Sequence, residues 1–113
     1  MISGMTSSEN VIEILSVLQK KIRTTKIYWE HIVQHKHGEL AGRLQEILEV
    51  MRDADDVYRQ DETSDIYLYY KNGKEYSACA VAKHLNGDGF IVTAYITTKA
   101  KRKGICIWTK KTK

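Results

Sequence analysis

The chain has 113 residues, with 18 basic and 14 acidic side chains and a net charge of +4. This length fits one domain over residues 1–113, and an apolar content of 42% is sufficient for a core without disulfides or a structural metal. No apolar run reaches the roughly 20 residues that cross a bilayer, and the polar residues 1–10 lack the apolar core of a secretion signal. We therefore expect a cytoplasmic protein that does not contact a membrane, with residues 1–8 flexible.

Apolar residues spaced three and four apart dominate the first half of the chain, which is typical of amphipathic helices. We predict three helices, over residues 9–22, 26–36 and 39–54. Thr25 can cap the second helix, and Gly38 can end it. The apolar stripes of these helices supply the predicted helical core: Leu15, Leu18, Trp29, Ile32, Leu44, Ile47 and Leu48.

After residue 55 the apolar period shortens to two, which is the spacing of β-strands. We predict strands over residues 57–60, 65–70, 75–85, 90–98 and 105–108. Asn72-Gly73 is a hairpin turn signal between the second and third of these strands. Helices followed by consecutive strands indicate an α+β fold, with N-terminal helices packed on a four- to five-stranded antiparallel sheet.

The predicted strand over residues 90–98 has two different faces. Strict alternation places Phe90, Val92, Ala94 and Ile96 on an apolar face, expected to pack against the helices together with Val81. Thr93, Tyr95 and Thr97 then form a hydroxylated face on the opposite side. Three hydroxyls in a row can hold a phosphodiester, although the same residue types also suit any solvent-facing strand.

The C-terminal end of the chain is basic and contains no acid after Asp88. Such a segment attracts polyanions and speeds their encounter with the protein. We therefore predict that Lys99, Lys101 and Lys103 bind substrate together with Thr97. A lysine tail that only keeps the protein soluble is the alternative, and charge alone does not separate the two.

Three histidines lie within seven residues, at positions 31, 35 and 37. Histidine is the usual acid and base near neutral pH, so an acid–base site is one interpretation. Polar surface is a second. A zinc site is a third, because His31 and His35 share one helix face, but Glu39 is the best third ligand and its spacing matches no zinc pattern. Elsewhere, Cys79 and Cys106 are expected to be buried thiols, and His84 a surface residue at a strand end.

Four segments resemble a known family. Residues 25–40, TKIYWEHIVQHKHGEL, resemble a phage and bacterial pattern T…WxHIxxxxHPEL, matched here by Thr25, Trp29, His31, Ile32, His37, Glu39 and Leu40. Residues 55–57 resemble its following "PD-V/I" step, residues 89–95 its "GxxVTAY" strand, and Lys103-Gly104 with Trp108 its closing "KG…W". Residues 22–109 thus resemble the phage-associated branch of the Barnase–EndoU–colicin–RelE-like nuclease superfamily. The chain departs from the pattern at two turn positions, Gly38 and Ala54.

The resemblance implies N-terminal helices before a four-stranded antiparallel sheet, and a metal-independent, toxin-like ribonuclease without a cofactor. Carried over by position, His31 and His37 match the motif histidines, and Thr93 and Tyr95 match the strand motif, whereas His35 matches nothing. We therefore predict an RNA endonuclease that leaves a 2′,3′-cyclic phosphate, with these four matched residues catalytic and RNA as the partner. A neutralising protein partner is left open. The alternative is a non-catalytic nucleic-acid- or protein-binding module on the same fold.

Overall fold

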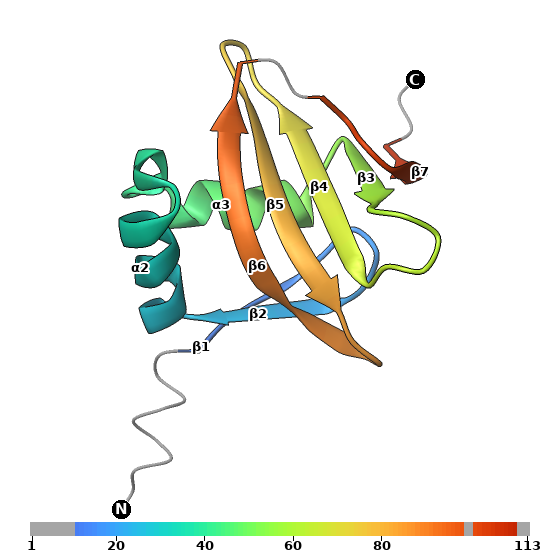
Figure 1. The fold of residues 1–113 in the computed structure, drawn as a ribbon, viewed down its shortest axis with the longest axis horizontal. Coiled ribbons are helices and arrows are strands. Elements are labelled where there is room, and N and C mark those ends of the chain that lie inside the picture. Colours follow the sequence, from blue (N-terminus) through green and yellow to red (C-terminus); the bar gives the residue numbers. More distant parts are fainter. Residues whose placement is uncertain (1–10, 99–100, 111–113) are drawn as a thin grey trace, which may run out of the picture.

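A computed structural model of the chain describes residues 11–98 and 101–110, so the predicted flexibility of residues 1–8 lies outside the described residues. The elements are β1 (Val11–Leu15), β2 (Lys21–Thr25), α2 (Lys26–His35), a short 3-10 helix η1 (Gly38–Leu40), α3 (Leu44–Arg52), β3 (Asp56–Arg59), β4 (Ile66–Asn72), β5 (Ser77–His84), β6 (Asp88–Thr97) and β7 (Ile105–Thr109). The strands of the described residues form one seven-stranded sheet in the order β1-β2-β6-β5-β4-β3-β7 (Figure 1).

The predicted fold class is wrong. The sheet has seven strands instead of four or five, and it is mixed, because β2 runs parallel to β6 while the other neighbouring pairs are antiparallel. The first predicted helix, over residues 9–22, is replaced in the described residues by the β1–β2 hairpin. The protein is therefore a strand-rich fold with two short α-helices inserted between β2 and β3.

Residues 11–25 form a hairpin because their apolar residues also fit an alternating pattern. Ile12 and Ile14 are half-buried, whereas their neighbours in β1 are exposed. A turn follows in which Gln19 has a φ of 67° and the Oγ of Ser16 accepts a hydrogen bond from the backbone N–H of Leu18 at 3.2 Å. Short apolar runs rich in β-branched residues do not separate helix from strand by spacing alone.

The change from helix to hairpin overturns part of the predicted core. The side chain of Leu15, expected to be buried, lies on the outer face of β1 and is 48% exposed. Leu18 falls in the turn and is half-buried against the core. Trp29, Ile32 and the other predicted helical residues are buried or packed against the main core, as predicted.

The second predicted helix is confirmed as α2. The Oγ1 of Thr25 caps it by accepting the backbone N–H of Tyr28 at 3.0 Å, as predicted. The third predicted helix is divided into η1 and α3, since Gly42 between them has a φ of +75° that no helix contains. The side chains of Ile47 and Met51 on α3 are fully buried.

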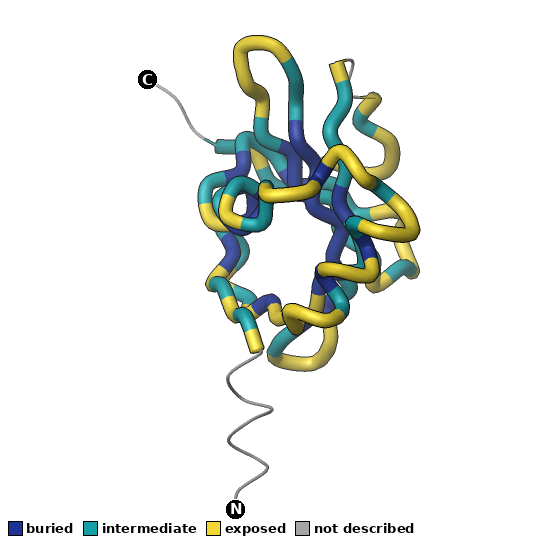
Figure 2. The backbone as a smooth tube through the Cα atoms, turned by 90° about the vertical axis from the view of Figure 1, so that its left-hand side faces the viewer, coloured by how far each residue is buried: buried dark blue, intermediate teal, exposed yellow. Residues whose placement is uncertain are grey.

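The sheet curls around α3. Figure 1 shows α3 lying across the back of β5 and β4, with β1 and β2 crossing near the lower ends of the long strands. The turn after β1 reaches α3 directly, because the backbone N–H of Val17 donates to the carbonyl of Met51 at 2.9 Å. Buried stretches of the backbone therefore face the middle of the molecule, while the loops are exposed (Figure 2).

A β-bulge in β6 changes which residues of that strand face the core, so the two predicted faces are partly wrong. The pairing with β5 shifts between Val81 and Ala82, so Val92 is an extra residue. Ile91 and Ala94 therefore both face the main core, although strict alternation would separate them. Phe90, predicted to be in the core, is 38% exposed, and Val92 packs with Val81 in a second cluster; Ala94 and Ile96 face the main core as predicted.

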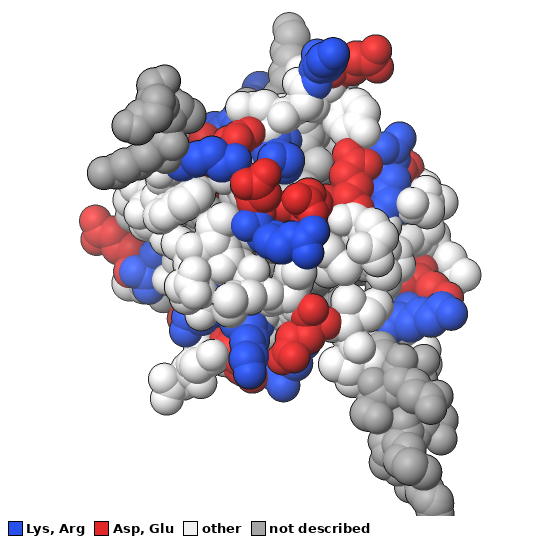
Figure 3. Space-filling view, turned by 180° about the vertical axis from the view of Figure 1, so that it is seen from behind, with Lys and Arg blue, Asp and Glu red and all other residues white. Residues whose placement is uncertain are grey.

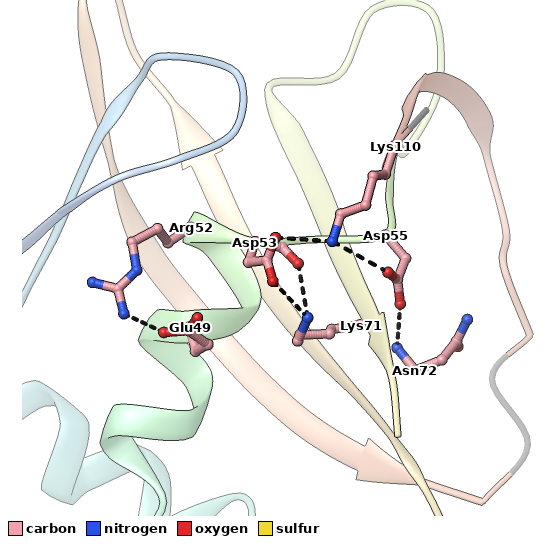
Figure 4. Close-up of polar contacts among 7 residues, drawn as sticks. All are labelled: Glu49, Arg52, Asp53, Asp55, Lys71, Asn72 and Lys110. Carbon is pink, nitrogen blue, oxygen red and sulfur yellow. Dashed lines mark hydrogen bonds and ion pairs between the residues drawn. The ribbon is translucent and has the colours of Figure 1, made fainter. Parts of the chain in front are cut away.

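Charges are paired around the end of β7. The carboxylate of Asp53 accepts hydrogen bonds from Lys71 at 2.9 Å and Lys110 at 2.8 Å, and these bonds lower the pKa of Asp53 to about 2 (Figure 4). Acidic and basic side chains are interspersed over the face that carries α3 (Figure 3). In the described part of the chain, none of the helices has the length and apolarity needed to cross a membrane.

Candidate functional site

A cleft of about 290 Å³ opens on the sheet face opposite α3. Its lining residues come from β4, β6 and the segment before β7: Leu68, Tyr70, Tyr95, Thr97, Lys101 and Lys103. Four of these six, namely Tyr95, Thr97 and the two lysines, are residues for which the sequence predicted a substrate contact. Among the described residues, the lining combines apolar surface from Leu68 and the tyrosine rings with hydroxyls and two lysines, and it includes no carboxylate. Hydroxyls and cations of this kind can hold a phosphate group.

His37 contacts Tyr95, one of the lining residues, although it does not itself line the cleft. The centroid of its imidazole is 6.2 Å from that of the Tyr95 ring. The position follows from the way α2 ends, since the backbone N–H groups of Lys36 and His37 both donate to the carbonyl of Ile32 at 2.9 Å. The chain then leaves the helix axis and enters η1, which packs on β6. Of the two predicted catalytic histidines, His37 is thus the one in ring contact with Tyr95.

Glu39 orients the imidazole of His37. Its Oε2 lies 3.1 Å from Nδ1 of His37, so the ring donates its Nδ1–H to the carboxylate. In the neutral ring this tautomer leaves the lone pair of Nε2 available as a proton acceptor. The sequence identified Glu39 only as part of a family motif and as a candidate metal ligand, and did not predict this role.

The backbone of Glu39 is in turn held by a network of hydrogen bonds centred on Arg43. The Nε of Arg43 donates to the carbonyl of Glu39 at 3.1 Å, and its Nη1 donates to Oε1 of Glu46 at 2.9 Å and to the hydroxyl of Tyr76 at 2.8 Å. The Tyr76 hydroxyl donates to Oε2 of Glu46 at 2.9 Å. These contacts connect the backbone next to His37 with the start of α3 and with the turn between β4 and β5.

Tyr95 is a protonated phenol with a polar neighbour at its tip. Burial raises the pKa of Tyr95 well above its usual value, and hydrogen bonding to Tyr70 and Cys79 raises it further. The hydroxyls of Tyr95 and Tyr70 are 3.4 Å apart. Burial also raises the pKa of the Cys79 thiol to about 12, so this cysteine is a neutral thiol near pH 7. Tyr95 can therefore donate a hydrogen bond but does not carry charge.

Arg102 fixes the lysine segment that borders the cleft. Its Nε donates to both carboxylate oxygens of Asp56, at 2.9 and 3.1 Å, and its guanidinium lies 4.7 Å from the centroid of the Tyr70 ring. Arg102 is half-buried, whereas Lys101 and Lys103 on either side of it are exposed. Sequence reasoning missed Arg102, although the alternation Lys-Arg-Lys in an extended segment already places its middle residue on the opposite side.

The remaining predicted site residues lie elsewhere. Thr93 is on the same strand face as Tyr95 but does not line the cleft, and its buried Oγ1 has no hydrogen-bond partner in the described part of the chain. Lys99 lies outside the described residues. The ring contacts of His31 run along α2, to Tyr28 at 6.0 Å and to His35 at 4.7 Å between centroids. Within residues 11–98 and 101–110, no group of three or more His, Cys, Asp or Glu side chains could hold a metal ion.

Two predictions on burial are wrong. His84, expected at the surface, is only 8% exposed; its ring stacks on Tyr67 with centroids 3.7 Å apart, and its Nε2 lies 2.8 Å from the hydroxyl of Tyr69. That hydroxyl donates to the Oγ of buried Ser16 at 3.0 Å. Cys106, expected to be buried, is exposed because it lies on β7, which is an edge strand of the sheet.

Comparison of the chain with protein-family models, with curated proteins and with solved structures finds no match. The resemblance to the nuclease superfamily therefore stays a prediction.

Proposed function

We propose that the protein is a metal-independent RNA endonuclease and that the cleft between Tyr95 and the lysine segment binds the scissile phosphodiester. The observation that carries this proposal is the position of His37, which is hydrogen-bonded to Glu39 and contacts Tyr95, a lining residue of this cleft. A neutral hydrogen-bond donor and two cations are then available in one cleft, with a proton acceptor next to the donor.

RNA can be cleaved at such a site by its own 2′-hydroxyl. In the proposed step, Nε2 of His37 takes the proton of the 2′-hydroxyl while the 2′-oxygen forms a bond to phosphorus. The bond from phosphorus to the 5′-oxygen breaks, and the leaving oxygen takes the proton of the Tyr95 phenol, which then regains one from the His37 imidazolium through solvent. The products are a 2′,3′-cyclic phosphate and a free 5′-hydroxyl, so no water is consumed in this step.

The other residues of the cleft match the charge that develops on phosphate. Lys101 and Lys103 are exposed at its border, where their ammonium groups can approach the non-bridging oxygens. The hydroxyl of Thr97 and the protonated phenol of Tyr95 can donate hydrogen bonds to the same oxygens. His31 and Thr93 have no assigned place in this mechanism, and the catalytic role that the sequence suggested for them stays a prediction.

The test is cleavage of a fluorescent single-stranded RNA oligonucleotide in EDTA. We expect cleavage by the wild-type protein, no cleavage where the nucleotide at the cut site lacks its 2′-hydroxyl, and a cyclic phosphate in the product by mass spectrometry. His37→Ala should lower the rate by about 10²–10⁴-fold, as expected for losing a general base. His35→Ala, which removes an exposed histidine at the end of α2, should leave the rate unchanged.

Each alternative gives a different result. RNA binding without cleavage by the wild-type protein would favour the non-catalytic binding module, since the same cleft can hold a phosphodiester without a reaction. Cleavage that is lost in EDTA and restored by zinc would contradict a metal-independent reaction. Equal losses in the His35→Ala and His37→Ala variants would remove the specific role of His37.

A further inference from the structure

Two histidines on the exposed face of α2 are not used by the proposed reaction. His31 and His35 are one helical turn apart, and the centroids of their rings are 4.7 Å apart with an angle of 39° between the planes. Both side chains are exposed to solvent. Imidazoles that are four residues apart on a helix lie on the same side, one above the other.

We propose that His31 and His35 form a surface site for one divalent transition-metal ion, such as Ni²⁺, Cu²⁺ or Zn²⁺. Neutral imidazole nitrogen is a preferred ligand of all three ions, with bonds of about 2.0–2.1 Å to zinc. Two rings stacked on consecutive turns can direct one nitrogen each at the same ion. Water or a group from another molecule completes the coordination, so the site needs no third ligand from this chain.

The backbone of α2 makes this pair ready for binding. The helix is capped by Thr25 and anchored by the buried side chains of Trp29 and Ile32, so the two histidine positions are held at a fixed separation. Binding then restricts only the side-chain torsions of the two rings. An ion that connects them also opposes unwinding of the turn between them, so the metal should stabilise the folded protein.

The pair is distinct from the proposed acid–base group. The imidazole of His37 contacts Tyr95 and the carboxylate of Glu39, whereas the rings of His31 and His35 contact each other and Tyr28. Metal binding and RNA cleavage therefore depend on different histidines. A matched set of three single alanine variants, all on or next to one helix, can separate the two properties.

The experiment is isothermal titration of the full-length protein with Ni²⁺, Cu²⁺ and Zn²⁺ at pH 7.5, after treatment with EDTA and dialysis. We expect one ion per chain, with Cu²⁺ bound more tightly than Ni²⁺ or Zn²⁺. His31→Ala and His35→Ala should each weaken binding by about 10²-fold, because the second ligand of a chelate acts at high effective concentration. His37→Ala should bind metal like the wild type.

Thermal unfolding with and without metal gives a second readout. The ion should raise the melting temperature of the wild type and of His37→Ala, and leave that of His31→Ala and His35→Ala unchanged. The proposed site would be wrong if His35→Ala left the metal affinity unchanged. It would also be wrong if His37→Ala lowered the metal affinity as strongly as His31→Ala and His35→Ala do. Neither readout requires cleavage, so a wild-type protein that binds metal at this pair but does not cut RNA would reject only the proposed nuclease activity.

Discussion

The imidazole of His37 and the phenol of Tyr95 lie beside each other, with ring centroids 6.2 Å apart, although one follows the end of α2 and the other belongs to β6. η1 brings them together, because it carries the chain from the helix to the sheet and packs on β6. This contact connects the acid–base chemistry of histidine with a cleft that is bordered by two lysines.

Replacing Glu39 by Gln should weaken catalysis without removing its base. The amide of Gln can still contact Nδ1 of His37, but it lacks the charge that stabilises the imidazolium formed during the reaction. Because this pair is exposed to solvent, the lost charge should cost about 0.2–1 kcal/mol, which corresponds to about 1.5–5-fold in rate. RNA cleavage kinetics would measure the loss. Glu30→Gln, at an exposed position of α2, is the control and should retain the full rate.

Arg43→Met should affect His37 at a distance. The variant removes the hydrogen bond from Arg43 to the carbonyl of Glu39. It also removes the hydrogen bond from Arg43 to Glu46, so that of this network Tyr76 alone still donates to the Glu46 carboxylate. We expect the NMR cross-relaxation between the rings of His37 and Tyr95 to weaken, while that between the rings of His31 and His35 stays unchanged. Equal His37–Tyr95 cross-relaxation in both proteins would show that Arg43 does not position His37.

The two lysines at the cleft should contribute to RNA affinity through counterion release. For single strands, the slope of log affinity against log salt falls by about 0.7 for each phosphate neutralised. The double variant Lys101→Ala/Lys103→Ala should therefore weaken binding and reduce the slope by about 1.4. Lys74→Ala, at an exposed position of the turn between β4 and β5, is the control. An equal change in slope per lysine removed in both proteins would indicate binding to surface charge in general.

Buried His84 should make stability depend on pH. Burial, followed by the charge of Lys20, lowers the pKa of His84 to about 4, from about 6.5 in the unfolded chain. Between these two values the unfolded state binds more protons, so stability is complete above about pH 6.5 and is lost as the pH falls toward 4. The expected loss from His84 between pH 7 and pH 5 is about 2 kcal/mol.

Urea unfolding at these two pH values measures this dependence. His84→Gln should remove about 2 kcal/mol of the difference in unfolding free energy between pH 7 and pH 5. His35→Gln, at an exposed histidine, should leave the difference as it is in the wild type. If the difference in unfolding free energy between pH 7 and pH 5 is as large in His84→Gln as in the wild type, groups other than His84 cause it.

Gly104 and Gly87 form a matched pair for a stability test. Their φ angles are +101° and +99°, so alanine is strained at both by about 1–2 kcal/mol. An added Cβ at Gly104 would meet the carbonyl of Arg59, whereas at Gly87 it has open space. Gly104→Ala should therefore cost about 2–5 kcal/mol, because overpacking of about 1–3 kcal/mol adds to the strain. Chemical unfolding measures both costs, and an equal loss of unfolding free energy in Gly104→Ala and Gly87→Ala would contradict the prediction.

The parts of the fold that the sequence predicted correctly have strong local signals. Thr25 provides the cap of α2, and Trp29 and Ile32 define its buried side. The β4–β5 hairpin follows the Asn72-Gly73 turn signal. The β1–β2 hairpin was missed because its turn is formed by Ser16 and a non-glycine residue, Gln19, with a positive φ, so no glycine or asparagine marks it.

The candidate site was predictable where it depends on strand alternation. Tyr95 and Thr97 share a face of β6, and that face does border the lysine segment. Which histidine reaches this face depends on how the chain leaves α2 and on the contact between η1 and β6, and neither has a sequence signal. The network of Arg43, Glu46 and Tyr76 likewise joins residues that only the tertiary fold brings together.

The parallel pairing of β2 with β6 also has a consequence for the order of folding. Only three residue pairs connect these strands, from Lys21 with Asp88 to Arg23 with Phe90, and they are far apart in the sequence. The β4–β5–β6 meander closes through short turns, so it can form first, whereas the loop between β2 and β6 costs more entropy to close. We therefore expect the N-terminal hairpin to dock last, and its amide hydrogens to exchange with solvent before those of β5.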